Sequence, residues 1–155
     1  MDETAQSIFA QTSEQWEWIV VDDGSTDDSW DKLLEYEQAH SNVHVFKRDR
    51  GPKGACTCRN IGVEKASGDF LFFLDTDDLI GKNAIADRIA IIEESTDSGI
   101  PYFPSVTFEK DPSQGFHWDD ADNPTVSWLT SLFTMTPPCT GTAPLWRKSD
   151  FVKIG

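Results

Sequence analysis

Two segments of the chain follow one pattern, in which an apolar run leads directly into aspartates. The first is WIVVDDGSTD (residues 18–27), and the second is FLFFLDTDD (residues 70–78). β-Branched and aromatic residues favour strands, whereas Asp, Gly and Ser favour the turn that comes next. Each segment therefore predicts a buried strand that feeds an acidic loop.

Helices are expected between these strands, because apolar residues recur there at helical spacing. One helix is predicted from about Trp30 to His40, and Ser25 or Thr26 is its expected N-cap. The other predicted elements, in chain order, are a strand over 43–46, a helix over 58–66 that Gly68 closes, a helix around Ile85–Ile92 and a strand over 102–108.

Strands that alternate with helices indicate an α/β fold with a mostly parallel sheet and helices on its faces. In such sheets, ligands bind outside the carboxyl ends of the strands. The acidic loops 22–23 and 75–78 both fall at that edge, which we call the carboxyl edge. The sequence therefore predicts a binding site there.

Length and charge narrow the function classes. The chain has 155 residues, which favours one domain, and its net charge of −14 disfavours nucleic acid or an anionic membrane surface as a partner. Its longest central apolar run, residues 70–74, is far shorter than a membrane span of about 20 residues. The acidic first residues do not resemble a signal peptide, so we expect a cytoplasmic protein without a transmembrane segment.

The loop after the second strand holds three carboxylates in four residues, Asp75, Asp77 and Asp78. Carboxylates this close repel one another, and a hard divalent cation with oxygen ligands relieves that repulsion. The alternative is a solvated acidic turn, which an acidic protein often forms. In the first loop, Asp22 or Asp23 can accept hydrogen bonds from a base or a ribose, and the alternative there is an Asx turn before the next helix.

The charge reverses locally over residues 47–59, which carry +4 within this acidic chain. Gly51 and Gly54 allow backbone N–H groups to approach a ligand closely, and a nearby helix start favours an anion. A site with basic groups on one side and a carboxylate-bound metal on the other would suit a diphosphate. The alternative is that this basic segment pairs with the acidic surface.

Taken together, these segments resemble glycosyltransferase family 2, whose members invert the sugar and have the Rossmann-like GT-A fold. The resemblance is close over residues 7 to about 95 and looser beyond. The matching stretches are SIFAQT (residues 7–12), WIVVDDGSTD (18–27), CRNIG (58–62), ASGD (66–69) and FLDTDD (73–78).

The resemblance implies a role for particular residues. Asp23, or its neighbour Asp22, would bind the base of a nucleotide-diphosphate sugar, most simply a UDP-sugar, and Arg59 would lie near the diphosphate. Asp75 would face the ribose, and Asp77 would ligate Mn²⁺ or Mg²⁺. The acceptor would be a saccharide or a lipid-linked acceptor, as in polysaccharide biosynthesis, which allows a location at the inner face of the membrane.

From about Asp111 prolines interrupt the chain, and this change predicts a boundary between a nucleotide-sugar-binding half (1–110) and an incomplete acceptor-side segment (111–155), within a single partial GT-A domain. Trp118 and Trp128 in that segment can stack on a sugar, although core packing is the more frequent use of Trp. The general base of the family is expected beyond the segment that ends at Gly155. Asp119, Asp120 and Asp122 are conceivable substitutes whose spacing recommends none of them.

A second departure from the family concerns its first strand. Members begin with an apolar strand, whereas Met1 is expected within the helix that follows it, so the sheet would lack a strand between the Trp18 and Phe70 strands. Such a chain is either a glycosyltransferase fragment or a catalytically silent nucleotide-sugar-binding or partner-binding module. Two weaker resemblances, to haloacid dehalogenase-like phosphatases and to receiver domains, rest on the acidic loops alone.

Overall fold

The computed structural model describes residues 1–94, 101, 103, 106–107, 116–117 and 144–154. The described helices are α1 (Asp2–Phe9), α2 (Ser29–Ala39), α3 (Ala55–Lys65), α4 (Ala84–Glu94) and α6 (Lys148–Ile154). The described strands are β1 (Trp18–Asp22), β2 (Val43–Lys47), β3 (Phe70–Leu71), β4 (Val106–Thr107), β5 (Phe116–His117) and β6 (Trp146–Arg147).

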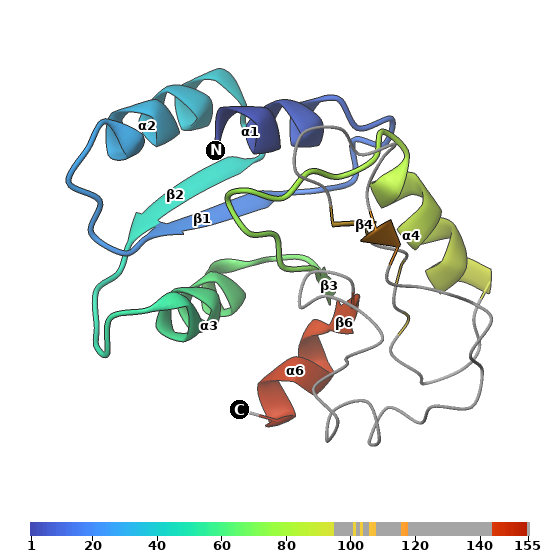
Figure 1. The fold of residues 1–155 in the computed structure, drawn as a ribbon. Helices are drawn as coiled ribbons and strands as arrows, with labels where there is room; N and C mark the ends of the chain where they lie inside the picture. The colour runs from blue at the N-terminus through green and yellow to red at the C-terminus, as the bar shows by residue number, and fades with distance from the viewer. Residues whose placement is uncertain (95–100, 102, 104–105, 108–115, 118–143, 155) are drawn as a thin grey trace.

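Strands β1 and β2 form a parallel pair in which Trp18 lies opposite Val43 and Asp22 opposite Lys47. Helices α1 and α2 cover one face of this pair, and α3 covers the other (Figure 1). The prediction of an α/β fold with helices on both faces is therefore confirmed. The helices predicted near 30–40, 58–66 and 85–92 are confirmed as α2, α3 and α4.

The face of the pair beneath α1 and α2 holds a closed core. Leu33, Val43 and Val45 are buried there. Aromatic side chains surround them, with the ring of Phe9 centred 5.9 Å from that of Trp18 and 5.6 Å from that of Tyr36. Aromatic pairs at such distances add stabilisation beyond the area they bury. This core fixes α1 and α2 on the sheet.

The opposite face of β1 packs on α3 through side chains of alternate residues. A Cβ added at Gly62 would lie 3.9 Å from a methyl carbon of Ile19 and 3.9 Å from one of Val21. These are ordinary van der Waals distances, so α3 lies directly against the strand at this position. Alternation along β1 thus places Trp18 and Val20 toward α1 and α2, and Ile19 and Val21 toward α3.

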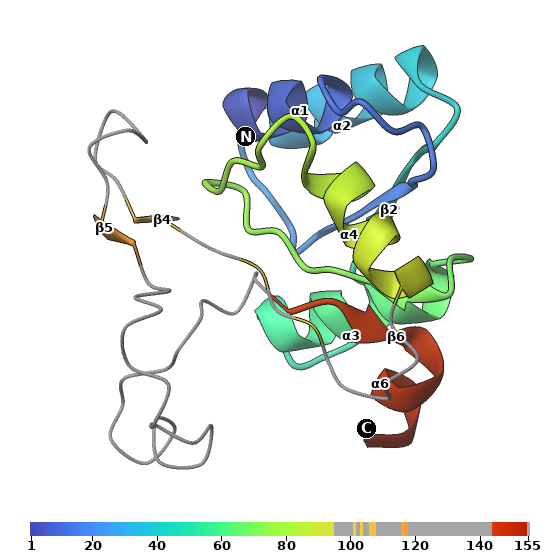
Figure 2. The same cartoon turned by 90° about the vertical axis from the view of Figure 1, so that its right-hand side faces the viewer.

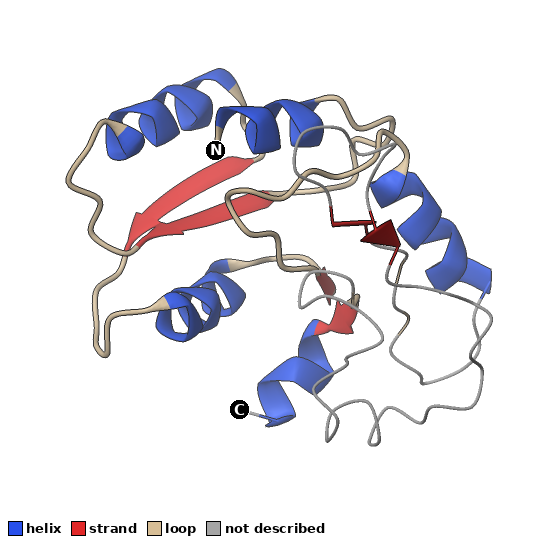
Figure 3. Ribbon diagram, viewed as in Figure 1, coloured by secondary structure: helices blue, strands red, loops and turns tan. Residues whose placement is uncertain are grey.

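The second predicted strand differs from expectation. Only Phe70–Leu71 of the segment 70–74 forms a strand, and β3 pairs antiparallel with β6 instead of joining β1. Figure 3 shows the short strands well apart from the β1–β2 pair. The prediction of a mostly parallel sheet is therefore wrong for the described residues, because β1–β2 is their one parallel pair, beside two antiparallel pairs.

The predicted N-cap of α2 is also wrong. The helix begins at Ser29, after Asp28. Ser25 instead lies in the turn after β1, where its backbone N–H donates to the Asp22 carboxylate, and the N–H of Ser29 donates to Asp27 Oδ1 at 3.1 Å. Short acidic side chains thus satisfy these N–H groups, as Asx turns commonly do.

Figure 2 shows α4 below α1 and in front of the β1–β2 pair, with β6 beside α3 and α6 below both. Most of the predicted strand 102–108, together with Trp118, Trp128, Asp119, Asp120 and Asp122, lies outside the described residues.

None of the helices in the described ranges has the length and apolar composition that a membrane crossing requires.

Candidate functional site

Asp22 ends β1 and shapes the loop after it. Its side chain is buried, and its carboxylate accepts hydrogen bonds from the backbone N–H groups of Gly24 (3.0 Å) and Ser25 (3.1 Å). Gly24 has a positive φ of 94°, which glycine adopts without strain. Burial acts to raise the pKa of Asp22, but hydrogen bonds from Ser25 and Gly24 outweigh it and lower that pKa. Asp22 therefore fixes the conformation of the loop that follows β1.

Asp23 points the other way, toward the start of α3. Its carboxylate pairs with the guanidinium of Arg48, which follows β2, and lies near the Gly54 N–H and the Cys58 thiol. Burial acts to raise the pKa of Asp23, but the hydrogen bond from Arg48 leads a set of contacts that lower it. The pKa of Cys58 is raised by burial and by the neighbouring Asp23 charge. Asp23 is thus an ionised acceptor at the carboxyl edge.

The second ion pair at this edge joins Arg59 of α3 to Asp75, which follows the Phe70–Leu74 segment. Arg59 Nη2 lies 2.6 Å from Asp75 Oδ1, and the two side chains are 38% and 53% exposed. A solvated pair of this kind contributes little to stability. Arg59 can therefore exchange Asp75 for another anion at low cost.

The loop 75–78 does not gather its carboxylates around one point. Asp75 faces Arg59, whereas Asp78 Oδ2 accepts a hydrogen bond from the Asp75 N–H at 3.4 Å. Asp77 is exposed. Within the described residues, no group of three or more His, Cys, Asp or Glu side chains is placed to hold a metal ion. The predicted three-carboxylate metal site is therefore not formed by the protein alone.

The basic segment 47–59 is largely paired with acidic or aromatic groups. Arg50 Nη2 lies 2.5 Å from Glu64 Oε1 on the outer side of α3, and the Lys47 ammonium lies 4.2 Å from the centre of the Trp30 ring. These contacts, with those of Arg48 and Arg59, match the alternative that the basic segment pairs with acidic surface. Two of the pairs, those of Asp23 and Asp75, nevertheless lie at the carboxyl edge.

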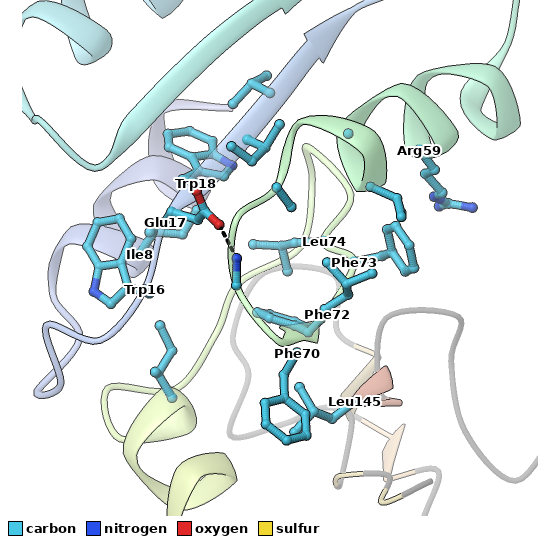
Figure 4. Close-up of a pocket in the computed structure, with 18 of the residues that line it drawn as sticks. Ile8, Trp16, Glu17, Trp18, Arg59, Phe70, Phe72, Phe73, Leu74 and Leu145 are labelled. Carbon is cyan, nitrogen blue, oxygen red and sulfur yellow. Dashed lines mark hydrogen bonds between the residues drawn. The ribbon is translucent and has the colours of Figure 1, made fainter. Parts of the chain in front are cut away.

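A cavity of about 800 Å³ opens beside these residues. Asp23, Arg59 and Asp75 line one part of it, and apolar residues of β1, α4 and the segment 70–74 line the rest. Figure 4 shows Arg59 at one side of the cavity and Trp18, Phe72 and Leu74 within it. The predicted residues Asp23, Arg59 and Asp75 are therefore brought together, while Asp22 supports the loop and Asp77 lies on the loop beyond.

Arg48 belongs to the basic segment 47–59 and Cys58 begins the CRNIG stretch, but the sequence did not indicate that either residue contacts Asp23. Arg48 directly follows β2, which is parallel to β1, so its position at the same edge as Asp23 could have been predicted from the strand order. Cys58 lies one turn into α3, and no local signal indicates its contact with Asp23.

The fold and the site together define an α/β protein with a cavity that Asp23, Arg59 and Asp75 line at the carboxyl edge. Residues 1–150 match the family model described as glycosyl transferase family 2. The chain belongs to glycosyltransferase family 2.

Several curated relatives share part of this chain. A putative teichuronic acid biosynthesis glycosyltransferase, TuaG of Bacillus subtilis, is 34% identical over 94 residues, which are 61% of this chain and 37% of that protein. WfgD of Escherichia coli, a UDP-Glc:alpha-D-GlcNAc-diphosphoundecaprenol beta-1,3-glucosyltransferase, is 35% identical over 86 residues, or 56% of this chain and 33% of that protein. The matched region thus spans about a third of each of these relatives.

A solved structure shares the fold. Residues 1–349 of Staphylococcus aureus TarS in complex with UDP align with a TM-score of 0.63 and 22% identity, covering 99% of this chain and 44% of that one. This likeness confirms that the chain has the α/β fold of the TarS GT-A structure.

Proposed function

We propose that this chain forms the donor-binding part of a glycosyltransferase that uses a UDP-sugar. The observation that carries the proposal is the convergence of Asp23, Arg59 and Asp75 at the carboxyl edge of a family 2 chain. Relatives support the choice of donor, because the name of WfgD specifies UDP-Glc and a TarS structure contains UDP.

Asp23 is the proposed contact for the base. An ionised carboxylate accepts hydrogen bonds only, and uracil offers one N–H donor. The carboxylate of Asp22 is occupied by the N–H groups of Gly24 and Ser25, which leaves Asp23 as the acceptor that lines the cavity. Arg48 keeps that carboxylate ionised and oriented.

Arg59 and the start of α3 are the proposed contacts for the diphosphate. Helix α3 has eleven residues, and Gly54 precedes it with a φ of 137° and no Cβ, so backbone N–H groups at the helix start remain accessible to an anion. A diphosphate would compete with Asp75 for the Arg59 guanidinium. Asp75 would then be released to accept hydrogen bonds from the ribose hydroxyls.

Asp77 is the proposed protein ligand for Mn²⁺ or Mg²⁺. The residues present fit such an ion, because Mg²⁺ usually binds through one or two carboxylates plus substrate phosphates, and Asp77 is exposed on the loop next to Asp75. When bound, the ion would neutralise negative charge on the nucleoside diphosphate leaving group. The chain's own residues would bind the base, hold the ribose and position the diphosphate.

The proposed reaction is direct displacement at the anomeric carbon with inversion, by a hydroxyl of a saccharide or lipid-linked acceptor. The proton of that hydroxyl requires a general base, and no described residue is assigned to this role. The acceptor side of the site and the division at about residue 110 remain predictions from the sequence. A cytoplasmic location, at the membrane face where a lipid-linked acceptor would lie, belongs to the same proposal.

Calorimetric titration of the purified chain with UDP tests the donor site. We expect binding that strengthens at least about tenfold when Mn²⁺ is present, and Asp77→Asn should remove that gain. Asp31→Asn, an equal charge change on the exposed surface of α2, is the matched control and should retain it. If the affinity for UDP did not depend on Mn²⁺, or if Asp77→Asn kept the gain from Mn²⁺, the assignment of Asp77 would be contradicted.

A further inference from the structure

Polar side chains on one side of α1, and just after it, contact the loop between β3 and α4. Thr4, Ser7 and Gln11 follow the spacing i, i+3 and i+7, which places side chains on one side of a helix. The loop lies beside α1 (Figure 2). Ser7 and Gln11 belong to the SIFAQT stretch, which has no part in the donor contacts proposed above.

Thr4 contacts the loop next to Asp77. The Thr4 side chain is buried, at 3% exposure, and its Oγ1 donates a hydrogen bond to the Thr76 C=O at 2.8 Å. Thr76 and Asp77 are the central residues of a turn. The turn is closed by the Asp78 N–H, which donates to the Asp75 C=O at 3.1 Å. A buried hydroxyl therefore orients the peptide group that joins Thr76 to Asp77.

Ser7 contacts the loop a few residues further on. Its Oγ accepts a hydrogen bond from the Ile80 N–H at 3.2 Å and donates one to the Thr4 C=O at 2.7 Å. The hydroxyl thus uses its donor within α1 and its acceptor for the loop. In the described part of the chain, the Ile80 N–H has no other acceptor.

Gln11 connects the end of the loop to α4. Its Nε2 donates to the Gly81 C=O at 2.8 Å, and its Oε1 accepts from the Ile85 N–H at 3.0 Å. Ile85 is the second residue of α4, so its N–H is one of those at a helix start that the helix itself leaves without an acceptor. The Thr12 N–H adds a hydrogen bond to the Lys82 C=O at 3.1 Å. The amide of Gln11 therefore fixes both the end of the loop and the first turn of α4.

The acidic end of the loop has weaker support from its own side chains. Asp77 is exposed, and the pair between Arg59 and Asp75 is solvated. A carboxylate that ligates a metal needs surrounding groups that hold it close to its productive position. The hydrogen bonds from α1 supply such support, because they fix the backbone on both sides of the turn 75–78.

We infer that Thr4, Ser7 and Gln11 are positioning residues for the proposed metal ligand Asp77. They act through the backbone of residues 76–85 and not by contact with the ion. This role rests on the proposed function, which assigns Mn²⁺ or Mg²⁺ to Asp77. The alternative is that the three side chains only attach α1 to the loop. Their loss would then leave the metal-dependent part of donor binding unchanged.

Calorimetric titration with UDP, with and without Mn²⁺, separates these alternatives. The measured quantity is the Mn²⁺ gain, which is the ratio of the two affinities. A general loss of folded protein lowers both affinities and leaves this ratio unchanged. Thr4→Val keeps the shape of the side chain and removes its O–H donor, so we expect a gain about two- to tenfold smaller than that of the parent. Thr4→Ser keeps the hydroxyl and should retain the parent gain.

A second pair of variants tests the other end of the loop. Gln11→Met keeps the length of the side chain and removes both of its hydrogen bonds to residues 81 and 85. We expect it to reduce the Mn²⁺ gain at least about twofold. Gln6→Met, the same change at an exposed residue of α1, is the matched control and should keep the gain.

Hydrogen–deuterium exchange followed by mass spectrometry tests the attachment of the loop without UDP or metal. Ser7→Ala removes the acceptor of the Ile80 N–H, and we expect peptides covering residues 76–85 to exchange at least about threefold faster. Ser41→Ala, at an exposed residue away from this loop, should exchange there like the parent. Unchanged exchange in Ser7→Ala would show that α1 does not hold the loop and would overturn the inference.

The two titration results distinguish failure of this inference from failure of the proposed function. A Mn²⁺ gain in Thr4→Val and Gln11→Met as large as that of the parent would overturn the positioning role and leave the donor site standing. A parent chain without any Mn²⁺ gain would contradict the assignment of Asp77 itself, and the positioning role with it.

Discussion

The core beneath α1 and α2 and the apolar segment 70–74 are packed to very different degrees. Leu33, Val43 and Val45 are buried to 9% exposure or less under α1 and α2. The segment 70–74 is just as apolar, yet each of its residues is half-buried and only two of them form a strand. Apolar character therefore does not by itself produce a buried strand, because the strand also needs neighbours on both edges and both faces.

The largest expected effect lies in the closed core. Leu33→Ala should lower the free energy of unfolding by about 2–5 kcal/mol, because it removes buried methyl groups and leaves a cavity. Urea unfolding followed by circular dichroism measures this loss. Leu79→Ala, at a residue that is 39% exposed, is the control and should stay within about 0.5 kcal/mol of the parent. A similar loss in both variants would show that the core is not closed.

The next effect concerns Glu17, which connects the two regions. Its Oε1 accepts hydrogen bonds from Ser67 N–H (2.6 Å), Ser67 Oγ (2.9 Å) and Gly68 N–H (2.7 Å). Glu17→Ala should therefore cost roughly 1–3 kcal/mol in the free energy of unfolding, since several partners lose one charged acceptor. Glu14→Ala, at an exposed residue in the same loop, should change little in the same urea titration. If both variants lowered the free energy of unfolding equally, the side chain of Glu17 would not be what connects the two regions.

A smaller effect is expected in the apolar segment 70–74. Leu74→Ala should lower the free energy of unfolding by less than about 1.5 kcal/mol, because Leu74 is half-buried and already borders empty space. Comparing its urea midpoint directly with that of Leu33→Ala measures the contrast between the two regions. A loss as large as that of Leu33→Ala would mean that Leu74 is fully packed in solution.

The smallest effect is a pH dependence. Burial acts to raise the pKa of Glu17, but hydrogen bonds from Gly68 and Ser67 outweigh it and hold that pKa below its ordinary value of 4.5. A lowered pKa in the folded state stabilises the fold above pH 4.5 and loses this contribution as the pH falls through the folded value. Between pH 6 and pH 3, the parent should thus lose more stability than Glu17→Gln. If the parent and Glu17→Gln lost the same stability over this pH range in urea titrations, the lowered pKa of Glu17 would be contradicted.

Much of the fold could be predicted because periodicity is local. The spacing of apolar residues indicated β1, α2, β2 and α4 close to their observed bounds. The extent of the strand after Gly68 could not be predicted in this way, since only its neighbours in space decide whether residues 72–74 pair. The N-cap prediction at Ser25 failed because the carboxylate of Asp22 takes up the N–H of Ser25.

For the candidate site, the sequence indicated that carboxylates lie at the carboxyl edge, but it did not indicate which arginine each carboxylate contacts. Asp23 and Asp75 could be placed at the carboxyl edge because each ends an apolar run. The partners Arg48 and Arg59 come from other elements, 25 and 16 residues away in the chain. Which arginine meets which carboxylate depends on how α3 and β2 sit against β1, and no local pattern encodes that arrangement.

The carboxyl edge, where Asp23, Arg59 and Asp75 line the cavity, is the centre of the functional proposal. The most direct test is a crystal structure of the chain with UDP and Mn²⁺, with the ion located by its anomalous scattering. We predict the uracil against Asp23, the diphosphate beside Arg59 and an anomalous peak bonded to Asp77. UDP bound away from this edge, or Mn²⁺ bound to the diphosphate without Asp77, would contradict the proposal.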